Sequence, residues 1–263
     1  MSYEFVQYEK KGRIAYVTIN RPERLNALHP PANAEMREIF CDFRDDPDVW
    51  VAIVTGKGER AFSAGNDLVY TSQHQEERDQ PGFFTSRVPF GGITTDFDCW
   101  KPIIAAVNGY ALGGGLELAM ACDIIIASEH AELGLPEPRV GLIAGAGGVH
   151  RLPRHVPHKI AMGMLLTARR IPASEAYRIG LINEVVPPSE VIPTAEKWAG
   201  EILEAAPLCV RASKQMATTG IDWPFEIAFN HNYSELHKSV SSHDRIEGPK
   251  AFAEKRKPNW TGM

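Results

Sequence analysis

The sequence has few cysteines, no excess of basic residues and no long apolar run that is free of charge. Its four cysteines lie far apart without a C-x-x-C pair, which argues against a secreted disulfide framework and a zinc site. A net charge of −5 gives no general attraction to nucleic acid or to an anionic membrane. The most apolar stretch, residues 103–128, contains Asn108, Glu117 and Asp123, each costly in lipid. The first residues also lack a signal-peptide pattern, so we expect a cytoplasmic protein that binds neither nucleic acid nor membrane and holds no metal.

Length and composition indicate an ordinary globular chain. With 263 residues, 44% hydrophobic and 23% charged, it can build one large core, and bulk disorder is excluded. Short β-rich or continuous apolar runs predict strands at residues 14–19, 51–55, 102–107 and 123–127. Apolar residues at helical spacing predict helices at residues 34–43 and 116–122. Because strands and helices alternate here, the predicted fold class is α/β.

The second half of the chain has a different character. Helices are predicted at residues 160–167, 173–178, 191–204 and 208–216. We therefore predict an α/β core over residues 1–200 and a helical C-terminal region over residues 201–263. Residues 69–100 show no clean period and carry charged, Gly and Pro residues, which predicts a mobile surface segment with a functional role.

Several familiar motifs are absent from the sequence. The glycine clusters at residues 113–115 and 145–148 do not satisfy G-x-G-x-x-G, and neither is followed by Lys-Ser or Lys-Thr, which argues against dinucleotide and P-loop sites. Ser63 lacks the first glycine of a nucleophile elbow. The histidines between residues 150 and 158 fit no metal-binding spacing, and with the neighbouring arginines and lysine they predict an exposed basic turn.

Glu117 is the unusual residue of the sequence. It lies in an apolar helical pattern with no other charge between Lys101 and Asp123. A helix that is apolar all round is buried, and burial raises the pKa of a carboxyl group. Two interpretations stay open. The carboxylate is either satisfied by a distant arginine or backbone amides, or it is a general acid/base tuned toward neutral pH.

Glu137 and the glycine triplet before Glu117 give two weaker signals. Glu137 stands between Pro136 and Pro138, which fix its backbone, although a loop glutamate beside an arginine is most often a surface charge. The glycines at residues 113–115 leave bare N–H groups at a helix N-terminus, where negative charge is favoured. The triplet therefore suits an oxyanion that forms next to an acid/base group, with tight helix packing as the alternative.

At these residues the sequence resembles the crotonase (enoyl-CoA hydratase/isomerase) family over essentially its whole length. The matching blocks are residues 21–28, 61–68, 101–110, 113–119, 136–137, 145–148 and 251–256. Each block alone is a weak signal, but all of them in this order are specific.

The resemblance implies a crotonase-like spiral of β-β-α units, followed by C-terminal helices that form a homotrimer or a dimer of trimers. It implies an acyl-CoA thioester as the substrate, and no metal or redox cofactor, because coenzyme A is part of the substrate. The C-terminal segment would supply Lys255 to the CoA phosphates, within one subunit or across a subunit boundary.

The resemblance also implies roles for individual residues. Glu117 would orient and deprotonate water for attack at C3, and Glu137 would protonate C2. The backbone N–H groups of Asn66 and Gly114 would form the oxyanion hole, and the N–H of Gly145 would help to fix the water. Positions that match substrate contacts of the family are Arg24, Ala27, Ala64, Asp67, Leu68, Tyr110, Gly113, Pro136 and Lys255.

The acyl group stays open at this level. Residues 43–47 and 246–252 look closest to the carnitinyl-CoA dehydratase branch, whose trimethylammonium substrate would want an aromatic or acidic lining. Phe97, Asp98 and Trp100 are candidates for that lining. We expect ordinary fatty enoyl thioesters first, with carnitinyl-CoA dehydratase (crotonobetainyl-CoA hydratase) and enoyl-CoA isomerase as alternatives. A non-catalytic RNA-binding protein is a further alternative, against which the acidic balance argues.

Overall fold

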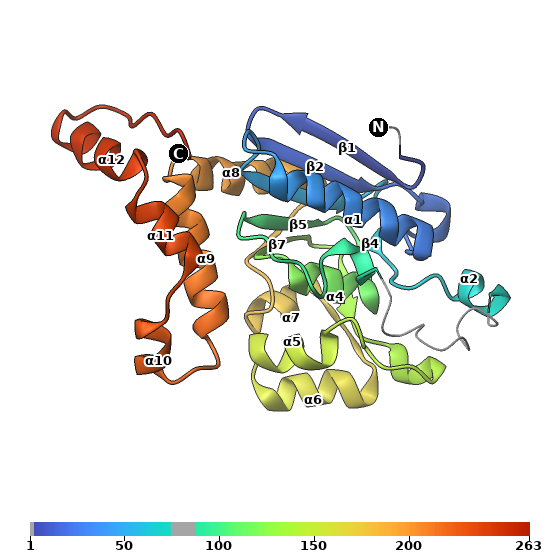
Figure 1. Ribbon diagram of the computed structural model, residues 1–263. Helices are drawn as coiled ribbons and strands as arrows, with labels where there is room; N and C mark the ends of the chain where they lie inside the picture. Colours follow the sequence, from blue (N-terminus) through green and yellow to red (C-terminus); the bar gives the residue numbers. More distant parts are fainter. Residues whose placement is uncertain (1–2, 75–87) are drawn as a thin grey trace.

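The computed structural model describes residues 3–74 and 88–263 of the chain. One sheet has the strand order β1-β2-β3-β5-β7-β10 (Figure 1). Its strands are β1 (Val6–Lys11), β2 (Ile14–Ile19), β3 (Val51–Gly56), β5 (Ile103–Val107), β7 (Ile124–Ser128) and β10 (Glu184–Val186). Neighbouring strands are parallel except in the β1–β2 hairpin. The four strands predicted from the sequence are confirmed in this sheet.

The other sheet has the order β4-β6-β8-β9 and is built from three-residue strands. These are β4 (Ala61–Ser63), β6 (Tyr110–Leu112), β8 (Glu132–Gly134) and β9 (Arg170–Pro172). The chain places β3, β5 and β7 in the first sheet and follows each with β4, β6 or β8 in the second. This repeated crossing makes the β-β-α spiral, which confirms the predicted fold class.

Helices cover both faces of the first sheet because successive side chains of its strands point to opposite faces. Val51 and Ile53 of β3 pack in the cluster that includes α8 (Val191–Leu203). Val54 packs instead in the cluster that includes α1 (Pro30–Asp45), which crosses the front of the sheet in Figure 1. Burial of each such side chain stabilises the fold by about 2 kcal/mol.

The remaining helices lie in the body and in the C-terminal region. The body also contains α2 (Leu68–Gln73), α4 (Gly114–Ala121), α5 (Gly148–His155), α6 (His158–Thr167) and α7 (Ala173–Arg178). Short 3-10 helices are η1 (Pro22–Arg24), η2 (Phe90–Gly92), η3 (Glu137–Val140) and η4 (Pro188–Glu190). No helix in residues 3–74 and 88–263 has the length and apolar character that a membrane span requires.

The C-terminal helices form an arm at one side of the body (Figure 1). They are α9 (Pro207–Gly220), α10 (Phe225–Asn230), α11 (Ser234–Val240) and α12 (Asp244–Ala253). An ion pair of 2.8 Å between Lys214 Nζ and Asp123 ties α9 to the body. The predicted boundary after residue 200 falls inside α8, and the helices of the arm begin at Pro207.

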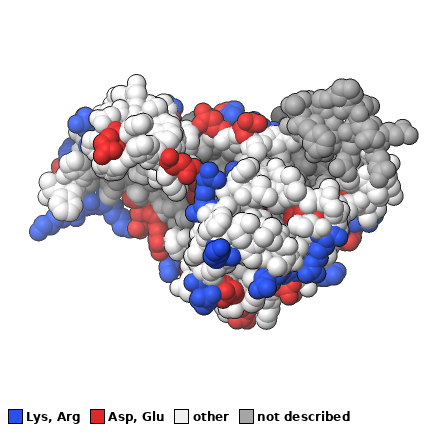
Figure 2. Space-filling view, turned by 90° about the horizontal axis from the view of Figure 1, so that it is seen from below, with Lys and Arg blue, Asp and Glu red and all other residues white. Residues whose placement is uncertain are grey.

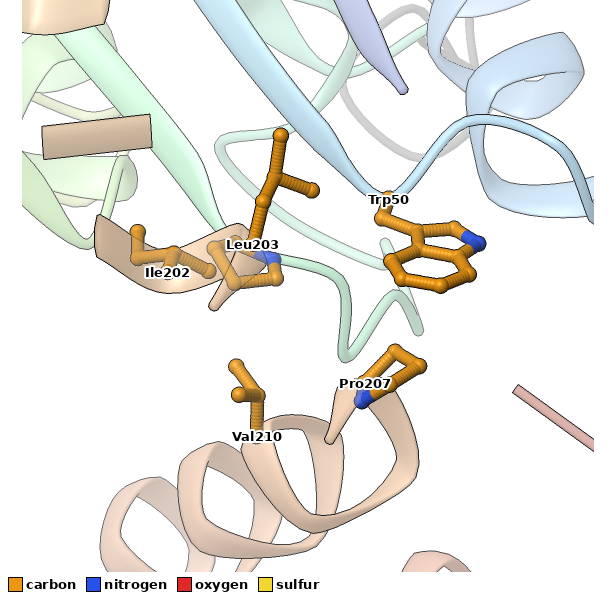
Figure 3. Close-up of a pocket in the computed structure, with 6 residues that line it drawn as sticks. Trp50, Ile202, Leu203, Pro207 and Val210 are labelled. Atoms are coloured by element: carbon orange, nitrogen blue, oxygen red, sulfur yellow. The ribbon is translucent and has the colours of Figure 1, made fainter. Parts of the chain in front are cut away.

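The joint between body and arm is apolar. Trp50, Leu203, Pro207 and Val210 face a small hollow between the start of β3, the end of α8 and the start of α9 (Figure 3). This hollow has no ionisable side chain in its lining, so it is no candidate for acid/base chemistry.

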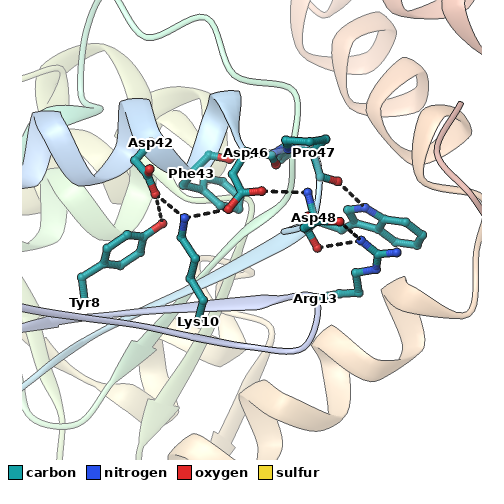
Figure 4. A network of polar contacts seen from close by, with 10 residues as sticks. Tyr8, Lys10, Arg13, Asp42, Phe43, Asp46, Pro47 and Asp48 are labelled. Atoms are coloured by element: carbon teal, nitrogen blue, oxygen red, sulfur yellow. Dashed lines mark hydrogen bonds and ion pairs between the residues drawn. The ribbon is translucent and has the colours of Figure 1, made fainter. Parts of the chain in front are cut away.

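A polar network connects α1 to the hairpin at the edge of the sheet (Figure 4). Tyr8 donates a hydrogen bond of 2.8 Å to Asp42. The ammonium group of Lys10 lies 2.6 Å from a carboxylate oxygen of Asp42 and also of Asp46. These groups are partly exposed, so the network positions α1 more than it stabilises the fold.

Two predictions need correction. Of the predicted surface segment 69–100, residues 75–87 lie outside the described residues, but residues 91–94 are buried, because their backbone packs against α1 and Leu118. The predicted basic turn between residues 150 and 159 is instead formed by α5 and α6. Arg151 on α5 is half-buried and not an exposed charge.

Candidate active site

The N-terminus of α4 is built from three glycines, each pressed against a different neighbour. Gly113 caps the helix with φ of 56°, and a Cβ there would lie 3.1 Å from Oε1 of Glu137. A Cβ on Gly114 would lie 2.5 Å from the Phe90 ring, and one on Gly115 only 2.0 Å from a backbone oxygen. The first N–H groups of the helix have no carbonyl partner within it. The predicted close packing and the predicted bare helix end are therefore both present.

The backbone before Asn66 lies directly beside this helix end. A Cβ on Gly65 would lie 2.8 Å from the backbone nitrogen of Gly114. Asn66 itself pairs with Leu28 in an isolated bridge, and its side chain is exposed and donates to Thr71 Oγ1 at 2.9 Å. The structure thus brings the peptides of residues 65–66 and Gly114 together. Their role as an oxyanion hole stays a prediction.

Glu117 projects from the first turn of α4 into the body, where it is only 3% exposed. Its Oε1 accepts a hydrogen bond of 2.7 Å from the backbone N–H of Gly148, the first residue of α5. Burial raises the pKa of Glu117 to about 7, although the Gly148 N–H acts in the opposite direction, and the nearby charge of Glu137 raises it further. The prediction of a buried carboxyl group is confirmed. A pKa near neutrality suits proton transfer in either direction.

Glu137 begins η3 and turns its carboxyl group back toward the glycines of α4. Its Oε2 is buried and has no hydrogen-bond partner within the described residues. Burial raises the pKa of this carboxyl group as well. The two glutamates therefore differ in their surroundings, since one accepts a backbone N–H and the other has a free buried oxygen.

The predicted contacts around η1 and α2 are close together. Arg24 and Leu68 are exposed, the latter by 43%. The carboxylate of Asp67 is already engaged, because it caps α2 through the Tyr70 N–H and pairs with Arg21 at 2.9 Å. Burial alone would raise the pKa of Asp67, but the hydrogen bonds from these two partners outweigh it and lower the pKa. Asp67 thus holds this corner of the structure in place.

Two small residues line the same corner. Ala27 is buried and its carbonyl accepts a hydrogen bond from Arg21. The N–H of Ala64 donates to the carbonyl of Leu25 at 3.0 Å, which joins the end of β4 to the residue after η1. Both alanines therefore connect the segments that carry Arg24 and Asp67.

The remaining predicted residues lie in different surroundings. The ring of Tyr110 on β6 faces Arg170 at 6.0 Å. The N–H of Gly145 donates to the carbonyl of Ile143 at 2.8 Å, so the proposed water contact would need a rearrangement there. Pro136 precedes η3 and helps to set the direction of Glu137. Lys255 follows α12, at the opposite end of the molecule from α2 (Figure 1).

Of the three candidates for the lining of a trimethylammonium group, Phe97 already has its ring occupied. The ring of Phe97 packs edge-on against Phe40 of α1, with ring centroids 6.0 Å apart. The guanidinium of Arg37 lies 5.3 Å from the centroid of the same ring. A second cation on Phe97 would meet this positive charge.

Phe90 and Arg151 were not identified as site residues from the sequence. Phe90 lies within the segment without periodicity, and its ring covers the Cα of Gly114. Arg151 lies among other basic residues, and only the helical register of α5 turns it inward. Among the described residues, no group of three or more His, Cys, Asp or Glu side chains is arranged to hold a metal ion.

Comparison with known proteins places this geometry in a family. The family model described as enoyl-CoA hydratase/isomerase matches residues 9–263. An (E)-benzylidenesuccinyl-CoA hydratase from Thauera aromatica is 44% identical, over 98% of this chain and 99% of that protein. A carnitinyl-CoA dehydratase from Escherichia coli K12 is 41% identical over the same shares. The crystal structure of an enoyl-CoA hydratase from Bacillus anthracis superposes with a TM-score of 0.90 at 32% identity, covering 99% of this chain and 100% of that one. The chain therefore belongs to the enoyl-CoA hydratase/isomerase family.

Proposed function

We propose that the chain catalyses the reversible addition of water across the 2,3 double bond of an acyl-CoA thioester. One observation carries this proposal. Glu117 lies in the first turn of α4, Glu137 reaches Gly113 at the start of that helix from η3, and burial raises the pKa of both carboxyl groups. The relatives named above act as a hydratase and a dehydratase, which supports the hydro-lyase class.

The thioester oxygen would be held by the backbone N–H groups of Asn66 and Gly114. Negative charge develops on this oxygen when water adds at C3, and preformed donors stabilise it without reorganisation. Loss of one such donor typically raises the barrier by about 3 kcal/mol. The close approach of residues 65–66 to Gly114 supports this assignment.

The surroundings of the two glutamates support different roles in the addition. Glu117 accepts the Gly148 N–H, which favours its ionised form, so we assign it as the base that deprotonates water. Glu137 has a buried oxygen without a donor, which favours the protonated form, so we assign it as the acid at C2. Because the two groups interact, the pH profile of the reaction reports the pair and not single residues.

The CoA moiety would pass η1 and α2, where Arg24 and Leu68 are exposed. Lys255 would reach a CoA phosphate only across a subunit boundary, because α12 lies far from α2 in the same chain (Figure 1). Large apolar side chains on the arm, such as Phe225 and Phe252, are 74% and 87% exposed. Apolar surface of this kind marks protein interfaces, which supports a homotrimer or a dimer of trimers.

The test is the loss of conjugated thioester absorbance when crotonyl-CoA is hydrated. We expect Glu117→Gln and Glu137→Gln each to lower the rate by about 100-fold or more. Glu201→Gln, an exposed position on α8, is the matched control and should not change the rate. If Glu117→Gln kept full hydration while Glu137→Gln did not, the two-carboxylate assignment would be wrong.

The acyl group is to be determined with a panel of thioesters. Fatty enoyl-CoA, crotonobetainyl-CoA and (E)-benzylidenesuccinyl-CoA should be compared by kcat/KM. The Arg37 guanidinium over Phe97 argues against a trimethylammonium site at that ring. An isomerase would instead raise the absorbance by converting a 3-enoyl into a 2-enoyl thioester.

RNA binding finds little support on the face shown in Figure 2. Basic and acidic side chains are interspersed there, and most of this surface carries neither charge. A salt-dependent shift of an RNA probe would be needed to revive this alternative.

A further inference from the structure

Arg151 occupies the space between two segments that both reach the candidate active site. It lies in the first turn of α5, and its Nη2 donates to the carbonyl of Thr94 at 2.7 Å. Its Nη1 donates to the carbonyl of Ala146 at 3.4 Å. A Cβ on Gly147 would lie only 2.1 Å from this Nη1, so the guanidinium packs directly against the backbone of Gly147. The side chain thus clamps Thr94 to residues 146–147.

The two segments that Arg151 joins both contact residues of the candidate active site. The turn at residues 146–147 leads directly to Gly148, whose N–H is bound to Glu117. On the other side, Thr94 donates through Oγ1 to the carbonyl of Phe90 at 2.9 Å. The Phe90 ring lies against Gly114. A movement of the guanidinium would therefore displace both the donor to Glu117 and the ring over the helix end.

The charge of Arg151 also acts on Glu117. Within the described residues it makes no salt bridge. Burial lowers the pKa of Arg151, and the attraction of its charge to Glu117 acts in the opposite direction. Two charged groups act on Glu117 itself, namely Glu137 from η3 and Arg151 from α5. The other elements packed on α4 are η2 and β4, which carry no charged side chain, and β6, whose Tyr110 faces Arg170.

We propose that Arg151 is a positioning residue, which holds the Gly148 N–H on Glu117 and supplies the counter-charge that allows Glu117 to act as a base. The inference rests on the proposed hydration reaction. It goes beyond that reaction because it assigns the protonation state of Glu117 to a side chain outside the glutamate pair, whose hydrogen bonds go to backbone carbonyls. Exposed Arg154, on the same helix, pairs with Asp222 at 3.0 Å and faces solvent. It is therefore the natural control.

The experiment compares Arg151→Met, Arg151→Lys and Arg154→Met with the wild type. For each protein, kcat and KM for crotonyl-CoA are measured across pH, together with the urea midpoint. We expect Arg151→Met to lower kcat at pH 7 by about tenfold, with a smaller change in KM. In the plot of kcat against pH, the rise on the acidic side (the acid limb) should move to higher pH in this variant. Loss of a nearby positive charge favours protonated Glu117, which cannot act as a base.

The lysine variant separates charge from geometry. Lysine keeps the charge but lacks the planar fork that binds two carbonyls. Arg151→Lys should therefore keep the acid limb near its wild-type position while kcat falls. Arg154→Met should match the wild type in both. An unmoved acid limb in Arg151→Met, with kcat reduced equally at every pH, would leave only a structural role and overturn the proposal.

The remaining outcomes are also decisive. If Arg151→Met does not fold, a lysine variant with wild-type kcat at every pH overturns the proposal, and one with lowered kcat and an unmoved acid limb supports it. If the wild type hydrates no enoyl thioester, the proposed function itself fails. That failure is distinguishable, because it appears before any variant is made.

Discussion

Replacing Glu117 by glutamine should stabilise the fold at alkaline pH while it removes activity. In the folded chain the pKa of Glu117 is about 7, compared with its usual 4.5. Between these values the folded state holds a proton that the unfolded state has lost, so the stability of the wild type falls as pH rises. Integration from pH 5 to pH 8 gives a loss of about 2.5 kcal/mol from this group alone. Glutamine does not titrate and avoids this loss.

The assay is urea unfolding at pH 5 and pH 8, followed by the fluorescence of the five tryptophans. Protein concentration is held constant because assembly would contribute to stability. The stability difference between Glu117→Gln and wild type should move in favour of the variant by about 2.5 kcal/mol from pH 5 to pH 8. Comparing the two pH values cancels any pH-independent effect of the amide. Glu201→Gln serves as the exposed control. A difference that does not change with pH would refute a raised pKa for Glu117.

Two further predictions concern packing and the C-terminus. Gly114→Ala should lower kcat by about tenfold or more, because the new Cβ would meet the Phe90 ring at 2.5 Å. Adding Phe90→Ala should recover part of the loss in steady-state kinetics, and a double variant no better than the single one would contradict this account. Asp244→Asn should lower the free energy of unfolding by about 2 kcal/mol, because the buried carboxylate accepts N–H groups of Thr261 and Gly262 at 2.8 Å. Urea unfolding tests this, and an unchanged midpoint would show that the C-terminal segment is held by other contacts.

The sequence predicted what depends on local pattern. Glu117 could be identified because its charge interrupts an apolar helical pattern, and the strand at residues 51–55 because an unbroken apolar run requires burial on both faces. The three-residue strands of the second sheet are too short to show a period. The helix α5 was missed because its histidines and arginines indicated an exposed basic turn, and Pro153 inside it argues against a helix.

The missing parts of the site depend on contacts between distant segments. Arg151 reaches Thr94 across 57 positions of the sequence, and no pattern within α5 records that distance. Phe90 is one aromatic residue in an irregular segment, and its importance comes from Gly114, a residue with no side chain. Such pairs become visible only when the fold brings them together.

The run of three glycines at the start of α4 has a consequence for how this chain can evolve. A methyl group would clash with a different neighbour at each position. At residue 113 it would crowd the carboxyl group of Glu137, at residue 114 the ring of Phe90, and at residue 115 the carbonyl of Ser63 in β4. A side chain at residue 114 therefore requires a smaller neighbour at residue 90, so these two positions should vary together. Residue 115 must stay glycine, because any side chain there would clash with a backbone carbonyl, which no substitution of a neighbour can remove.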